Sequence, residues 1–232
     1  MMKIILLIVV CSGICLTSSA GEITGTVQAE GVANADDGSD NGGAYASRQY
    51  KFAPQVDYGA MHDFVVYIEG HVGTNSAPST NMTQVSTTRV AQRGAAFSPH
   101  VLPVMVGTTV EWPNDDQICH NVFSMSDPKQ FDLGLYKGNP PEKRVTFDQP
   151  GRVDVYCSIH SNMHCVVLVL ENPYFASTDA NGHYVINDVP PGTYKLKAWH
   201  ERLPADEQEI TVSTNGVVKA DFTLAVKNLP KY

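Results

Sequence analysis

Basic residues are scarce in this 232-residue sequence, in which 16 lysines and arginines stand against 24 aspartates and glutamates for a formal net charge of -8. An acidic surface repels nucleic acids and anionic membranes, so the composition argues against both as partners. The sequence also lacks an apolar run long enough to span a bilayer comfortably, since the N-terminal stretch 4–16 is too short. We therefore expect no stable membrane insertion.

Residues 1–20 are typical of a secretory signal peptide. A single charge, Lys3, precedes the apolar stretch, and small residues follow at 17–20, where a signal peptidase would cut. We expect cleavage after Ala20 and a periplasmic or secreted mature protein. Cleavage would leave three of the five cysteines in an oxidising compartment, namely Cys119, Cys157 and Cys165.

A thiol, an imidazole and a thioether stand three residues apart at Cys157, His160 and Met163. Alternating apolar residues precede them and the apolar run 166–170 follows, which predicts two strands joined by a short loop. Such a loop would aim the three side chains at one point. Soft sulfur with imidazole is a copper ligand set, and one thiolate, two imidazoles and a weak axial methionine make a blue-copper site. The fourth ligand should be a histidine from elsewhere in the chain.

The region from about residue 85 to 171 predicts continuous β-structure. Short alternating stretches, such as 108–112, 144–148 and 153–157, are separated by turn residues. Many short strands with turns between them are typical of a sandwich or a barrel. The stretch 125–142 is rich in proline, glycine and aspartate, and we expect it to be a loop that crosses the fold.

Three motifs of this region resemble cupredoxins of the plastocyanin and amicyanin group. They are Gly-Thr-Thr-Val-Glu-Trp-Pro-Asn at 107–114, His-Asn-Val at 120–122 and Cys-x-x-His-x-x-Met at 157–163. The spacing of the last motif matches amicyanin best. The resemblance implies a Greek-key β-sandwich that holds one type 1 copper ion.

By this resemblance the copper ligands are His120, Cys157, His160 and Met163. Asn121 is similar to the cupredoxin asparagine whose side chain ties the histidine strand to the cysteine loop. The simpler alternative is a core cysteine beside a surface histidine, with Met163 as core filler. The strand before the motif and the upstream His-Asn-Val triplet favour the copper site over that alternative.

The proposed site also suggests a pairing for the other two cysteines. Cys119 directly precedes His120, and Cys165 lies two residues after Met163, so one metal would hold both segments close together. We therefore expect a Cys119–Cys165 disulfide. Two free thiols are the alternative that the sequence leaves open.

The other histidines have no metal-ligand spacing. On extended backbone His164 should point away from its neighbour Met163, so we expect it to be a surface histidine. For His100 we expect a structural or exposed role rather than ligation. Four further histidines lie outside the copper region: His62, His71, His183 and His200.

The sequence changes character after residue 172. Asp-Ala-Asn-Gly at 179–182 and Pro-Pro-Gly-Thr-Tyr at 190–194 lie among alternating strand patterns. These motifs resemble the carboxypeptidase regulatory-like module, a transthyretin-like β-sandwich. Such modules begin with a Gly-x-Val strand and a second strand, and the matching stretches here lie at 25–27 and 64–69.

We therefore expect an all-β chain in which one domain is nested within another. Residues 22–72 and 173–226 would build the regulatory-like sandwich, and residues 83–172 would form the inserted cupredoxin. A plain tandem is the alternative, with the N-terminal strands added to the cupredoxin sheet.

A site of this kind predicts a non-enzymatic carrier of single electrons. Its partners would be exported or membrane-bound redox proteins such as c-type cytochromes, and the edge of His160 would be the electron port by analogy with cupredoxins. Copper oxidases and nitrite reductases commonly contain His-x-His pairs, which this sequence lacks, and a dinuclear copper site would need a cysteine where Ser161 stands. A copper-binding or delivery protein without electron transfer, and a metal-free structural protein, remain as alternatives.

Overall fold

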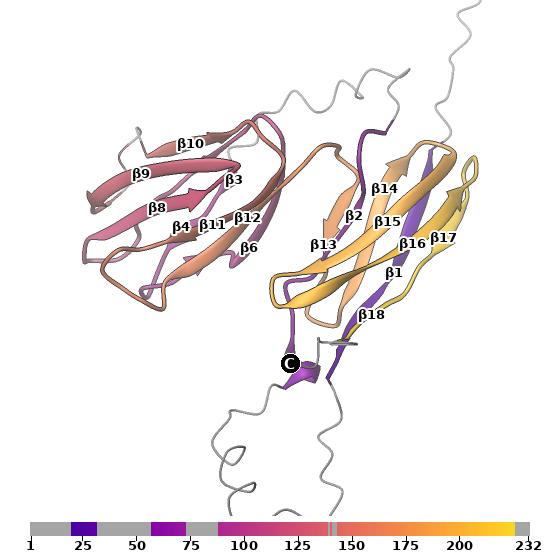
Figure 1. Cartoon of the computed structure of the whole chain (residues 1–232), viewed down its shortest axis with the longest axis horizontal. Coiled ribbons are helices and arrows are strands. Elements are labelled where there is room, and N and C mark those ends of the chain that lie inside the picture. The colour runs from indigo at the N-terminus through magenta and orange to yellow at the C-terminus, as the bar shows by residue number, and fades with distance from the viewer. Residues whose placement is uncertain (1–19, 32–56, 73–87, 139, 141–142, 226–232) are drawn as a thin grey trace, which may run out of the picture.

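The computed structural model of the chain is built almost wholly from β-strands (Figure 1). It describes residues 20–31, 57–72, 88–138, 140 and 143–225. Apart from Ala20, the expected signal peptide lies outside the described residues. No helix within the described ranges has the length and apolar character that crossing a membrane requires.

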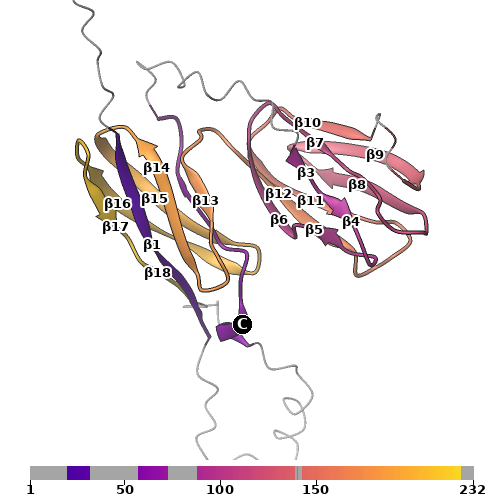
Figure 2. The same ribbon diagram turned by 180° about the vertical axis from the view of Figure 1, so that it is seen from behind.

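The strands between residues 88 and 170 form a β-sandwich (Figures 1 and 2). One sheet has the order β6-β12-β11-β8-β9, the second has the order β10-β7-β3, and β4 pairs with β5. The strands are β3 (Thr88–Arg89), β4 (Ala91–Gln92), β5 (Phe97–Ser98), β6 (Val101–Met105), β7 (Thr108–Glu111), β8 (His120–Ser126), β9 (Lys129–Tyr136), β10 (Arg144–Phe147), β11 (Gly151–Tyr156) and β12 (His164–Leu170).

The period-two alternation of the sequence fills the space between these sheets. Val153 and Val155 of β11 are fully buried, whereas Asp154 between them points to the other face. Trp112 is fully buried too, with its ring 5.9 Å from that of Phe97 in an edge-to-face arrangement. Each such side chain stabilises the fold by about 1.5–3 kcal/mol.

The stretch that we expected to cross the fold as a loop contains a strand, so that prediction was wrong. β9 pairs with β8 in an antiparallel hairpin, and Ser126 lies opposite Lys129 across its turn. Phe131 and Leu133 alternate along β9 and pack against the core, although neither is fully buried. β9 lies at the edge of its sheet and has aspartate and glycine between its apolar residues. Both residue types are uncommon in strands, so the composition predicted a loop.

The remaining strands build a second sandwich, which Figure 1 shows beside the first. Its sheets have the orders β14-β1-β17, with β18 also on β1, and β13-β2-β15-β16. The elements are β1 (Gly21–Glu30), the 3-10 helix η1 (Tyr58–Ala60), β2 (Val65–Ile68), β13 (Phe175–Ser177), β14 (His183–Val189), β15 (Gly192–His200), β16 (Leu203–Val212), β17 (Val217–Lys219) and β18 (Phe222–Ala225).

The N-terminal strands lie in the same sheets as strands from the end of the chain. β1 runs parallel to β17 and β18, with Val27 opposite Phe222. β2 lies between β13 and β15, with Val66 opposite Ala198. The division of the chain into a continuous domain at 83–172 and a discontinuous one around it stays a prediction.

A third apolar cluster joins the two sandwiches. It contains Val101 of β6 and Val166, Leu168 and Leu170 of β12, together with Val65 of β2. β12 is therefore buried on both faces, one against the core of the first sandwich and one against the second sandwich. A strand that is covered on both faces needs apolar side chains at every position, which explains why residues 166–170 are all apolar.

Candidate metal centre

Two segments that are far apart in the sequence meet at one end of the first sandwich. His120 opens β8, and the loop 157–163 connects β11 to β12. His120 Nδ1 lies 3.0 Å from His160 Nδ1, and Cys157 Sγ lies 3.6 Å from the same His160 nitrogen. Potential ligand atoms of these three residues all lie within 4.8 Å of one another. Folding thus brings three of the four predicted ligands together.

Asp116 orients His120, whose side chain is fully buried. Asp116 Oδ2 lies 2.8 Å from His120 Nε2. The Asp116 carboxylate also accepts hydrogen bonds from the backbone N–H groups of Ala95 and Gly94, which together with His120 lower the pKa of Asp116 to about 2. An ionised carboxylate only accepts, so Nε2 of His120 carries the proton and Nδ1 presents its lone pair to His160 and Cys157.

Cys157 is held at the end of β11 by the loop that follows it. Its backbone N–H donates to the Met163 carbonyl at 3.1 Å, and the Met163 N–H donates to the His160 carbonyl at 3.0 Å. The Asn121 backbone N–H lies 3.4 Å from Cys157 Sγ and points at it. Cys157 is 6% exposed and Met163 is 1% exposed, and both belong to the core cluster of the first sandwich. The fourth predicted ligand, Met163, is therefore buried in the same core as Cys157.

The role expected for the Asn121 side chain is not the one observed. Its Nδ2 donates to Asp132 Oδ1 of β9 at 2.7 Å instead of reaching the cysteine loop. The pairing of β8 with β9 shifts register between Asn121 and Phe123, and the Asn121 side chain bonds the neighbouring strand there. Asn114 braces the approach to His120 instead, since its Nδ2 donates to the carbonyls of Ile118 and Tyr136.

The predicted Cys119–Cys165 disulfide is absent, because both residues are free thiols in the structure. Cys165 pairs with Val155 across β11 and β12 and is fully buried in the core. Cys119 directly precedes the buried His120 and is exposed to solvent. Cys119 therefore lies at the surface, whereas Cys165 lies in the core. Burial raises the pKa of the Cys165 thiol well above its ordinary value, which keeps it unreactive.

The donors at this site fit a copper ion. The lone pair of His120 Nδ1 faces His160 Nδ1 at hydrogen-bond distance, so the two imidazoles share either a proton or a metal cation. A cysteine sulfur beside two imidazoles is a donor set that suits copper, although zinc also accepts it.

Comparison with known protein families gives two matches. Residues 84–170 match the family of copper binding proteins described as the plastocyanin/azurin family, and residues 166–225 match the carboxypeptidase regulatory-like domain. The first sandwich is thus the part of the chain that matches the copper-binding family, and this match supports copper as its metal.

Solved structures similar to this chain also include copper proteins. A Cu-containing nitrite reductase from Thermus scotoductus SA-01 is 30% identical over 37% of this chain and 22% of its own, with a TM-score of 0.34. A purple cupredoxin from Nitrosopumilus maritimus is 27% identical over 35% of this chain and 98% of its own, with a TM-score of 0.31. A reduced Cu(I) amicyanin mutant is 24% identical over 36% and 82%, with a TM-score of 0.32. This chain thus spans about a fifth of the reductase, and the cupredoxin assignment depends on the family match.

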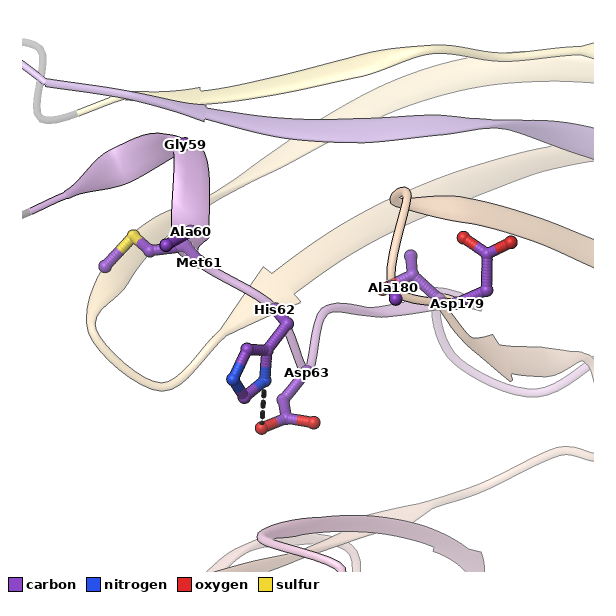
Figure 3. A pocket seen from close by; sticks show the side chains of 8 residues that line it. Gly59, Ala60, Met61, His62, Asp63, Asp179 and Ala180 are labelled. Carbon is purple, nitrogen blue, oxygen red and sulfur yellow. Dashed lines mark hydrogen bonds and ion pairs between the residues drawn. The ribbon is translucent and has the colours of Figure 1, made fainter.

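The second sandwich has a pocket of about 310 Å³ at the end near η1 (Figure 3). His62, Asp63 and Asp179 are among the residues that line it. The His62 ring is paired with the Asp63 carboxylate at 2.7 Å, and the His62 side chain is 69% exposed. Asp179 accepts instead from the backbone N–H groups of Asn181 and His183, so these side chains are already paired and do not converge as ligand donors.

Proposed function

We propose that this protein is an exported type 1 copper protein that carries single electrons between redox partners and is not itself an enzyme. The observation that carries the proposal is the convergence of His120, Cys157 and His160 at one end of a cupredoxin domain. Met163, buried in the same core cluster, would be the weak axial ligand.

The copper ion would supply the one-electron chemistry, since it is stable as Cu(I) and as Cu(II). The chain would supply a rigid and dry pocket. Asp116 locks the His120 ring, and the backbone hydrogen bonds between Cys157, His160 and Met163 close the loop. Donors held in place by the protein move little when the charge changes, so each transfer would need little rearrangement.

His160 is the proposed electron port. It is half-buried, whereas His120 is completely buried. Two exposed isoleucines belong to the converging segments: Ile159 is 53% exposed beside His160, and Ile118 is 51% exposed two residues before His120. An apolar rim suits brief docking over a small interface, and an exported or membrane-bound c-type cytochrome is the kind of partner expected.

Two measurements on the copper-loaded protein test this proposal. A potentiometric titration should show one reversible electron per chain, and stopped-flow mixing with a reduced c-type cytochrome should show electron uptake without metal loss. Ile159→Glu should slow the cytochrome reaction while leaving the midpoint potential unchanged, because it alters the rim and no ligand. Val185→Glu on β14, where the native side chain is 47% exposed, is the matched control and should react like the wild type.

Transfer of the copper ion itself would overturn the electron-carrier proposal. If the partner leaves the mixing experiment with the metal, the protein is a copper delivery protein, the alternative expected from the sequence.

A further inference from the structure

A second cluster of potential metal ligands lies where the two sandwiches meet. His100 precedes β6 and His164 opens β12 in the cupredoxin domain, while Glu201 lies in the turn between β15 and β16 of the second sandwich. Potential ligand atoms of the three residues lie within 4.8 Å of one another. His100 Nε2 is 2.9 Å from Glu201 Oε1, and His164 Nδ1 is 3.9 Å from Glu201 Oε2.

Each imidazole uses its other ring nitrogen on a fixed acceptor. His100 Nδ1 lies 3.2 Å from the backbone carbonyl of His164, and His164 Nε2 lies 3.0 Å from Asp154 Oδ1. Carbonyl and carboxylate oxygens only accept, so both of these nitrogens carry protons. His100 Nε2 and His164 Nδ1 are the ring nitrogens left to face Glu201. Metal-binding histidines are commonly held in this way by a carbonyl or a carboxylate.

The contact between His100 and Glu201 is incomplete without a positive charge. Both His100 nitrogens face oxygens that only accept, so Nε2 meets Glu201 Oε1, 2.9 Å away, through either a second ring proton or a metal cation. Glu201 offers its carboxylate as the third donor to a cation at this position.

Two carboxylates lie near these histidines, those of Asp154 and Glu201, and Arg152 is paired with the first of them. Arg152 places its guanidinium on Asp154 through Nε and a terminal nitrogen, at 2.7–3.1 Å. Another Arg152 nitrogen donates to the Glu201 backbone carbonyl at 3.1 Å, and the guanidinium lies over the Trp199 ring. Arg152 thereby neutralises Asp154 and braces the turn that presents the Glu201 side chain.

We propose that His100, His164 and Glu201 bind a divalent metal ion of the zinc class, which clasps the cupredoxin domain to the second sandwich. Two imidazoles and one carboxylate form a common zinc ligand set, with water in the fourth position. Ligands at about 2.0–2.2 Å from a tetrahedral ion lie roughly 3.3–3.6 Å apart, so the side chains need to move by only about an ångström.

The side chains have room for that adjustment and a route for the ion. His100 is 36% exposed, His164 is 23% exposed and Glu201 is 15% exposed. Because the donors come from both sandwiches, the bound ion would add to the apolar cluster that already joins them. The peptide bond between Met163 and His164 would also link this site directly to the proposed copper loop.

Zinc titration of the metal-free full-length protein and four variants tests this metal site independently of the copper proposal. The wild type should bind two Zn²⁺ ions per chain, one at each cluster. Cys157→Ser should weaken the first and keep the second, whereas Glu201→Gln or His100→Asn should remove the second and keep the first. Asp154→Asn should weaken the second by about 10–100-fold, because Asp154 only orients His164.

The matched control is His183→Asn, which changes an exposed histidine on β14 and should bind as the wild type does. Co²⁺ gives an independent readout in the Cys157→Ser chain, where weak visible bands without sulfur charge transfer should appear and should vanish with Glu201→Gln. The proposal is overturned if Cys157→Ser binds no more Zn²⁺ than Cys157→Ser combined with Glu201→Gln. In that case a proton on His100 fills the gap.

Discussion

Replacing Asp116 with asparagine is the sharpest test of how the metal centre is built. The change keeps the size of the side chain but removes the charge that faces His120 Nε2 at 2.8 Å. An amide turned toward that nitrogen would donate a hydrogen bond to it, which favours the His120 tautomer with its proton on Nδ1. Nδ1 is the nitrogen that faces Cys157 and His160, so the proton would have to leave before a metal binds there.

The expected cost follows from the role of Asp116 as an orienting partner. Loss of such a partner typically weakens metal affinity by about 10–100-fold, which corresponds to roughly 1.4–2.7 kcal/mol. The asparagine oxygen can still accept one of the backbone hydrogen bonds that Asp116 receives from Gly94 and Ala95. The loop should therefore stay folded, and the loss should fall mainly on copper affinity.

A competition titration between the protein and a coloured Cu(I) chelator measures this loss. Asp115→Asn is the control, because Asp115 is the neighbouring aspartate but pairs with Arg93 at 3.0 Å and does not contact His120. We expect Asp115→Asn to bind copper like the wild type. Equal affinity of the two variants, with both melting cooperatively, would refute the orienting role of Asp116.

Three further predictions concern the second sandwich and the domain division. Gly25→Ala should lower the free energy of unfolding by about 1–3 kcal/mol in denaturant titrations, because an added Cβ would lie 1.8 Å from the Ala220 carbonyl oxygen, whereas Gly59→Ala has room and should be close to neutral. Asp221 accepts from Lys219 and from Thr26, which lowers its pKa below 3.8, so its stabilisation is present above about pH 3.8 and is lost as the pH falls through the lower folded value. The stability difference between wild type and Asp221→Ala should thus be largest at neutral pH and should shrink in acid, and a difference that grew in acid would contradict this. Limited proteolysis should release no folded C-terminal fragment if the sandwich is nested, and a stable fragment that begins near residue 173 would favour a tandem.

The parts of the metal centre that could be predicted from the sequence are those encoded by local spacing. Cys157, His160 and Met163 lie on one short loop between two strands, so the approach of Cys157 to His160 follows from the spacing of the loop. His120 could be placed only through the resemblance to cupredoxins. Its orienting partner Asp116 was missed because the carboxylate is held by backbone groups of a turn about twenty residues earlier.

The wrong predictions for the disulfide and for Asn121 have one physical cause. Both required knowing the direction in which a side chain points, and local sequence does not determine that direction. The disulfide failed because Cys165 faces the core while Cys119 faces solvent. The Asn121 side chain donates to Asp132 of β9, a strand that the composition had predicted to be a loop. The cluster of His100 and His164 with Glu201 spans about a hundred residues and two sandwiches, so no spacing rule could reveal it.

The central claim is that Cys157, His120 and His160 hold one copper ion through a sulfur bond. The visible absorption spectrum of the Cu(II)-loaded protein tests it most directly. We predict an intense band from thiolate-to-copper charge transfer that disappears on reduction and is absent from Cys157→Ser. A loaded protein without that band, or a Cys157→Ser variant that retains it, would contradict the account.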